Sequence, residues 1–142
     1  METVEEVTLQ RRYLSLVDET EEDQADTLKF SFSSEKPVSR YAFDEVLDHS
    51  EESVDMTRLN AGAPLLFNHN PDKPIGVVQR AWLSDRKGYA RIKWGTSQLA
   101  EEIRRDVENG ILKSISVGYR IEEADTEEKY GVVRATSWTP YE

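Results

Sequence analysis

Only one segment of this chain clearly has an apolar residue at every fourth position, and this feature constrains the fold most. Within residues 97–109, Leu99, Ile103 and Val107 recur at every fourth position and form one apolar stripe along a helix. Most other apolar runs alternate with polar residues, which is typical of strands that bury one face. The pattern predicts an α+β domain, mostly antiparallel or mixed β, with one main helix.

The predicted helix ends carry start and stop signals. Thr96 is a suitable N-cap for the main helix, and Gly110 is a suitable left-handed stop. Ser53 can cap a short second helix that reaches Leu59 and ends at residues 60–62. We therefore expect one or two short helices beside the main one.

Strands are predicted where apolar or alternating runs lie between turn residues. They cover residues 7–17, 28–33, 63–69, 75–83, 89–94, 111–121 and 130–138. In the second run Leu28, Phe30 and Phe32 share one face, and we expect this strand to pair with the first run. Residues 38–49 fit a short strand or turn followed by a helical turn, and residues 125–129 fit a polar turn.

Composition and charge narrow the class of protein. At 142 residues with 37% hydrophobic content, the chain fits a single domain over residues 1–142 with a real core. Its net charge of −10 argues against non-specific binding to nucleic acid. The absence of cysteine excludes disulfides and thiolate catalysis, and the apolar runs are too short to span a membrane. The acidic N-terminus lacks signal-peptide features, so we expect a soluble cytoplasmic protein.

The two histidines of the chain differ in their surroundings. His49 lies in an acidic, polar stretch and is expected to be an ordinary surface residue. His69 follows the apolar residues 65–67 and precedes a proline-rich turn, so it lies at a strand end, where a rigid scaffold presents functional groups. The pattern alone leaves His69 open between a structural and a catalytic role. The histidine spacing fits no zinc motif, and no phosphate or dinucleotide loop is present, so neither a metal nor a cofactor is expected.

The strand at residues 111–121 has one bulky and one small face. Ser114, Ser116 and Gly118 share the small face, which leaves room for a ligand or a second backbone to approach. A serine hydroxyl becomes a nucleophile when a base such as histidine takes its proton. On this pattern alone, tight packing is the better explanation of the small face, and geometry alone does not choose between Ser114 and Ser116.

Three short motifs, taken in order, resemble the prohead (procapsid maturation) protease family of tailed phages. They are Phe-Asn-His-Asn at 67–70, Pro-Ile-Gly-Val-Val at 74–78 and Ser-Val-Gly-Tyr at 116–119. An amphipathic helix that ends in glycine lies between the second and the third motif. The family typically has an Asn-His pair, an Ile-Gly-hydrophobic strand, such a helix and a Ser-hydrophobic-Gly-aromatic strand. The resemblance covers about residues 27–142.

This resemblance implies a fold, an activity and two catalytic residues. The fold is shared with herpesvirus assembly proteases and is a small mixed β-barrel with helices around it. Ser116 is the implied nucleophile, because the Ser-x-Gly-aromatic motif begins there and not at Ser114, and His69 is the implied general base. The implied substrates are capsid and scaffold proteins and the protease itself. The implied location is the immature procapsid in the host cytoplasm, or the bacterial cytoplasm for a prophage.

The third catalytic residue and the oxyanion donors stay open. The herpesvirus relatives use a second histidine on a later strand, but this chain has no histidine after His69. We expect an acid to orient the imidazole instead, and Glu142 is the candidate, with an exposed terminal residue as the alternative. Backbone amides around Gly118, or an arginine on a loop, are candidates for the oxyanion hole.

The C-terminal end departs from the family pattern, in which a further apolar strand follows. We therefore expect a truncated chain, a self-cleaved product or the front of a longer protein fused to a capsid domain. A barrel without its closing strand leaves an open edge, which predicts a homo-oligomer that shares or swaps an edge strand. Two other functions remain: a catalytically incomplete capsid-assembly or scaffold domain with the same fold, and an unrelated β-rich binding domain.

Overall fold

A computed structural model describes residues 10–15, 26–127 and 130–142 of this protein, with the side chains of residues 13–15 left aside. The strands are β1 (Gln10–Ser15), β2 (Thr27–Ser34), β3 (Val38–Ser39), β4 (Asp44–Leu47), β5 (Pro64–Leu66), β6 (Pro74–Ser84), β7 (Lys87–Trp94), β8 (Ser114–Glu127) and β9 (Val132–Pro140). The helices are α1 (Thr57–Asn60), the single turn η1 (Phe67–His69) and α2 (Gln98–Glu108).

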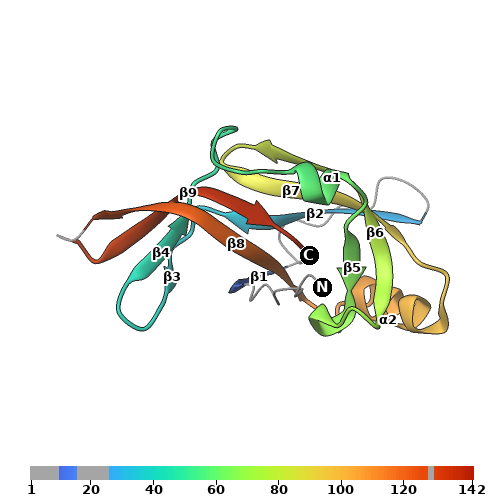
Figure 1. Ribbon diagram of the computed structural model, residues 1–142. Coiled ribbons are helices and arrows are strands. Elements are labelled where there is room, and N and C mark those ends of the chain that lie inside the picture. The colour runs from blue at the N-terminus through green and yellow to red at the C-terminus, as the bar shows by residue number, and fades with distance from the viewer. Residues whose placement is uncertain (1–9, 16–25, 128–129) are drawn as a thin grey trace, which may run out of the picture.

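The described strands form two sheets that together make a nearly closed, barrel-like structure (Figure 1). One sheet has the order β1-β8-β9-β4-β3, and the other has the order β2-β7-β6-β5. Neighbouring strands are antiparallel except for β4 and β9, which are parallel. The prediction of a mostly β domain with a mixed sheet and few helices is therefore confirmed. No described helix is long and apolar enough to cross a membrane.

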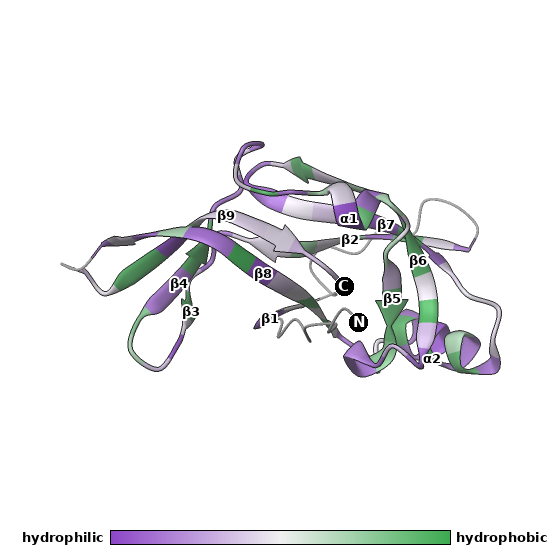
Figure 2. Ribbon diagram, viewed as in Figure 1, coloured by the Kyte–Doolittle hydropathy of each residue, from purple (hydrophilic) through white to green (hydrophobic). Residues whose placement is uncertain are grey.

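The core lies between the two sheets and receives side chains from both. Ile92 of β7 on one side, and Leu47, Tyr119 and Trp138 on the other, are almost fully buried. Figure 2 shows apolar stretches along β5, β6 and β8, where these strands line the interior. In Figure 1 the C-terminus lies between β8 of one sheet and β5 of the other. This arrangement brings the C-terminal residues close to η1.

Helix α2 confirms the predicted main helix, with ends at residues 98 and 108. Its N-cap is Ser97, whose hydroxyl accepts a hydrogen bond from the amide of Ala100 at 3.1 Å. The expectation of a Thr96 cap was wrong by one residue, because either hydroxyl suits the sequence and the extended backbone of Ser97 decides. Gly110 has a φ of +70° and ends the helix as predicted.

The predicted pairing of the first two strands was wrong. β1 pairs with β8, and β2 pairs with β7 of the other sheet. Alternation fixes which face of a strand is buried but leaves its partner open. β2 is also buried on both faces, since Ser31 and Ser33 are as inaccessible as Phe30 and Phe32.

Several segments differ in detail from the sequence predictions. Residues 38–49 form the β3–β4 hairpin and not a helical turn. Ser53 does not cap α1, because its hydroxyl bonds to Asp48, and the Asp55 carboxylate accepts from the first amide of α1 instead. β8 continues to residue 127, so the predicted polar turn at 125–129 was wrong in its described part.

Candidate active site

A tight loop after β5 positions His69. Asn68 and His69 both have left-handed backbone, with φ of +53° and +51°. Asparagine tolerates this conformation better than other residues with a β-carbon, which gives a physical reason for Asn at position 68. Two consecutive left-handed residues turn the chain sharply out of β5, and such strain is typical of residues held for function.

Backbone hydrogen bonds close this loop on itself. The Phe67 amide donates to the Lys73 carbonyl at 3.0 Å, and the Lys73 amide donates to the Asn70 carbonyl at 2.9 Å. The Asn70 side chain accepts from the amide of Asp72 at 2.9 Å. The loop that carries His69 is therefore fixed at both of its ends, by β5 before it and β6 after it.

Ser116 lies on β8, opposite Tyr13 of β1. Its hydroxyl makes a hydrogen bond with Nε2 of His69. Ser114 lies on the same face of the strand but is exposed, and the hydrogen bond to the imidazole is made by Ser116. The structure thus brings together the two residues that the sequence motifs single out.

Glu142 lies on the other side of the imidazole. Its Oε1 is 3.1 Å from Nδ1 of His69, and the side chains of His69 and Glu142 are 8% and 19% exposed. An ionised carboxylate only accepts hydrogen bonds, so Nδ1 carries the proton of this contact. In the neutral ring, Nε2 is then an acceptor that faces the hydroxyl of Ser116.

A β-bulge beside Gly118 aims Glu142 at the histidine. The amides of Tyr141 and Glu142 both donate to the Gly118 carbonyl, at 2.8 and 3.4 Å, and the Gly118 amide donates to the Glu142 carbonyl at 2.8 Å. Two residues therefore oppose one, and bulges of this kind redirect a side chain. The guanidinium of Arg58 lies 4.4 Å from the centre of the Tyr141 ring and packs against this segment from α1.

The same bulge uses the backbone amide of Gly118, which was one of the predicted oxyanion donors. The Gly118 amide is already bonded to Glu142, so it does not point free into the site. Amides alternate sides along an antiparallel strand, and the Ser116 amide therefore faces the same side as that of Gly118. The Ser116 amide is therefore a neighbouring candidate donor on this side of β8.

A hollow of about 170 Å³ opens beside the serine and the histidine. Side chains of β2, β5, β6, β7, α2 and β8 line it, and most of them are aliphatic or aromatic. Ser114, Ser116, His69 and Glu142 supply its polar groups. The trio therefore lies at the rim of an apolar pocket and is accessible to a ligand.

Tyr119, the aromatic residue of the serine motif, anchors β8 in the opposite direction. Its hydroxyl bonds to the Glu45 carboxylate, and Arg40 donates to the same hydroxyl at 2.8 Å. The buried guanidinium of Arg12 completes this network through contacts with Tyr119 and Glu45. Buried charges need partners of this kind, and the network links β1, β4 and β8.

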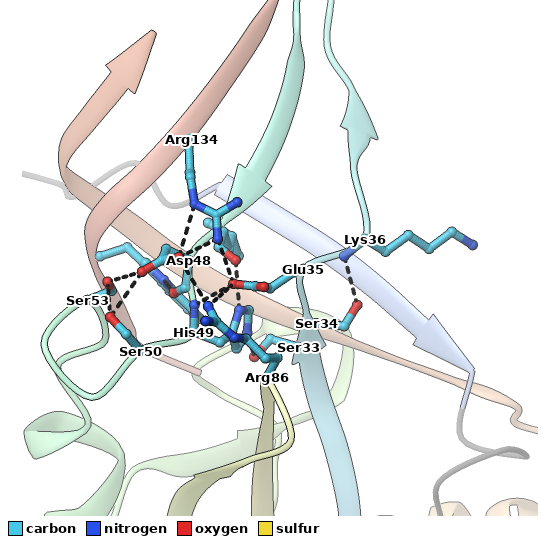
Figure 3. Close-up of polar contacts among 12 residues, drawn as sticks. Ser33, Ser34, Glu35, Lys36, Asp48, His49, Ser50, Ser53, Arg86 and Arg134 are labelled. Atoms are coloured by element: carbon cyan, nitrogen blue, oxygen red, sulfur yellow. Dashed lines mark hydrogen bonds and ion pairs between the residues drawn. The ribbon is translucent and has the colours of Figure 1, made fainter. Parts of the chain in front are cut away.

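The expectation that His49 is a surface residue was wrong, because its ring is buried and is 4% exposed. Nδ1 lies 2.7 Å from the Leu47 carbonyl, and Nε2 lies 2.8 Å from the hydroxyl of Ser33. The ring also packs edge-on against Trp138. Figure 3 shows this histidine among the polar side chains of Asp48 and its neighbours. Ser33 is fully buried, so this second serine–histidine pair is closed to substrate.

Asp48 and Arg134 hold the polar cluster around His49 together (Figure 3). Burial works to raise the pKa of Asp48, but hydrogen bonds from Ser53 and Arg134 outweigh it and hold that pKa far below the ordinary value of 3.8. Burial lowers the pKa of His49, against opposing contributions from the Leu47 carbonyl and the Glu35 carboxylate. Both groups therefore favour their states at neutral pH, an ionised Asp48 and a neutral His49.

The fold and the site define a small β-barrel-like domain in which a serine, a histidine and a carboxylate are linked in series, as they are in serine hydrolases. The chain belongs to the caudovirus prohead serine protease family, whose model matches residues 5–138. The resemblance seen in the sequence motifs is thus confirmed at the level of the family. Glu142 lies beyond the matched residues.

A protein named "Major capsid protein" from Halomonas phage phiHAP-1 is a relative of this chain. The two are 43% identical over an alignment of 119 residues, and the match covers 79% of this chain and 20% of that protein. The chain thus spans about a fifth of the length of this relative. No solved structure matches the chain, and the herpesvirus assembly protease fold stays an expectation from the family resemblance.

Proposed function

We propose that this domain is a serine endopeptidase that cleaves capsid and scaffold proteins, and itself, within the immature procapsid in the host cytoplasm. The observation that supports it best is the series of hydrogen bonds from Ser116 through His69 to Glu142. Membership of the prohead serine protease family supports the same class of reaction. Capsid protein as a substrate is supported by the name of the Halomonas phage relative.

In this mechanism Ser116 Oγ attacks the carbonyl carbon of the scissile peptide bond. His69 Nε2 takes the hydroxyl proton and later gives it to the leaving amine as the carbon–nitrogen bond breaks. Water, activated by the same nitrogen, then hydrolyses the acyl-enzyme. Glu142 keeps the Nδ1 proton in place and stabilises the imidazolium that forms, and the Ser116 amide stabilises the developing oxyanion.

Labelling with a fluorophosphonate tests the nucleophile without a known substrate. The parent domain and the Ser114→Ala variant are expected to be labelled, whereas Ser116→Ala and His69→Ala are not. Ser114→Ala is the matched control, since it removes a hydroxyl from the same face of β8, two residues away. Labelling that survives in Ser116→Ala would contradict the assignment.

A second function follows from the relative named as a capsid protein. The domain would then serve capsid assembly and retain the protease fold without turnover. Co-expression with the capsid protein of the same phage separates the two functions, because only an active protease processes it. Cleavage that disappears in His69→Ala supports the protease. Intact capsid protein that still co-assembles with the parent domain supports the assembly role.

The homo-oligomer expected from the sequence stays a prediction, which light scattering over a range of concentrations would test.

A further inference from the structure

The pocket beside Ser116 has a composition that selects its occupant. Leu112, Val107, Phe67 and Trp94 are among the aliphatic and aromatic residues that line it. The charged or titratable groups among its described lining residues are His69 and Glu142, and these two bond to each other at the rim. A charged ligand group in the depth of the pocket would lose its hydration without gaining a partner.

The volume of the pocket fits one side chain. At about 170 Å³ it is close in size to an apolar cavity of about 150 Å³ that is known to hold benzene. A leucine, methionine or phenylalanine side chain occupies space of this order, whereas alanine leaves most of it empty. Filling it removes apolar surface from water on both partners.

The position of the pocket relative to the nucleophile decides which substrate residue enters it. Ser116 lines the pocket together with the two residues that precede it on β8, Ser114 and Ile115. The bond that forms during acylation joins Ser116 Oγ to the carbonyl carbon of the residue before the scissile bond. The side chain of that residue is therefore the nearest substrate group to this pocket.

We propose that the pocket is the main specificity site of the enzyme and that cleavage follows a residue with a medium-sized or large apolar side chain. This inference rests on the proposed protease function and adds the substrate class to it. Specificity of this kind needs no charged recognition residue. Val107 on α2 and Leu112 after it are among the residues that line the pocket.

Fluorogenic peptide amides that differ only in the residue before the scissile bond test this inference. The series contains alanine, leucine, phenylalanine, lysine and glutamate at that position. We expect kcat/KM for leucine to exceed that for alanine about 50-fold, the ratio that burying three further carbon groups corresponds to. Phenylalanine is expected to resemble leucine, and lysine and glutamate are expected to be poor substrates.

Two substitutions at one position change the size of the pocket in opposite directions. Val107→Phe fills it and is expected to bring the leucine-to-alanine ratio close to one, while Val107→Ala deepens it and favours phenylalanine over leucine. Leu99→Phe is the matched control, because Leu99 lies on the same apolar stripe of α2 but does not line the pocket. Melting temperatures show which variants fold, and Val107→Ala keeps the test valid if the larger residue prevents folding.

The inference is wrong if lysine or glutamate is preferred, if all five peptides are cleaved alike, or if Leu99→Phe changes the preference as much as Val107→Phe. Fluorophosphonate labelling separates these results from a failure of the protease itself. Labelling at Ser116 with the wrong preference refutes the pocket assignment alone. A folded domain that neither reacts with the label nor cleaves any peptide refutes the proposed function.

Discussion

The contact between His69 and Glu142 allows a quantitative prediction about catalysis. When Ser116 attacks, His69 becomes positively charged, and the carboxylate 3.1 Å away then attracts it. Coulomb's law gives about 1 kcal/mol for two unit charges at this distance in bulk water and about 5 kcal/mol at an effective dielectric constant of 20. The 19% exposure of Glu142 places the site between these limits.

Glu142→Gln is the substitution that removes this attraction with the least change in shape. The amide oxygen can still accept the Nδ1 proton, so the loss is mainly that of the negative charge. We expect the second-order rate constant for fluorophosphonate labelling at Ser116 to fall about 10-fold to 10³-fold, with binding of the label little changed. Glu142→Ala, which also frees the imidazole to rotate, is expected to fall further.

Asp72→Asn is the matched control for charge. Asp72 is exposed and lies in the loop that follows His69, and it changes the local charge by the same amount. We expect its labelling rate to stay within about twofold of the parent, because exposed charges are strongly screened. Glu142→Gln with the parental rate, at an unchanged melting temperature, would refute the role of Glu142. An equal loss in Asp72→Asn would assign the effect to the general field of the site.

Three further predictions concern stability. The pKa of His49 is lowered on folding, so its contribution to stability is complete above the ordinary pKa of 6.5 and is lost as the pH falls below that value. The melting temperature should therefore decrease between pH 7 and pH 5. Because the pKa of Asp48 is also lowered, the loss of stability should steepen below pH 3.8. Asn68 has a φ of +53°, so Asn68→Val should lower the free energy of unfolding in urea by about 1–3 kcal/mol, whereas Asn68→Gly should change it little. Equal stability of the two variants would contradict backbone strain at this residue. Gly76→Ala should cost a similar amount, about 1–3 kcal/mol, because a β-carbon there would lie 2.7 Å from the Lys93 carbonyl, and a stable variant would show that the β6–β7 pair can separate.

The predicted parts of the fold are those that depend on local periodicity. The stripe of Leu99, Ile103 and Val107 fixed the main helix, since no other spacing buries the three together. Alternation located β2, β6 and β7 to within a few residues. Strand partners were not predictable in this way, because β1 and β2 have the same pattern whether they pair with each other or with β8 and β7.

The candidate site, too, has parts that local sequence signals predicted and parts that they did not. His69 and Ser116 carried motif signals, and Glu142 was named as the candidate acid from its place in the chain. The bulge through which Glu142 reaches the imidazole was not predictable, because a bulge is a property of hydrogen bonds between strands that single-strand periodicity does not contain. The hydrogen bond between the Gly118 amide and Glu142 was not predictable from the sequence for the same reason. The apolar pocket was not predictable from the sequence either, since its lining comes from seven separate elements of the fold.

The two serine–histidine pairs show what distinguishes a site from a structural contact. Both pairs join a serine hydroxyl to Nε2 of a histidine. At His49 the other ring nitrogen faces a neutral backbone carbonyl and the serine is fully buried, so the pair satisfies two buried polar groups and no more. At His69 the other nitrogen faces a carboxylate, the backbone is left-handed, and the serine borders a pocket. Of the two pairs, only the one at His69 borders a pocket, so only there does a carbonyl have room to approach the serine oxygen. Mapping the fluorophosphonate label tests this argument: it should be found at Ser116 and not at Ser33, because a serine without access to the reagent is not attacked.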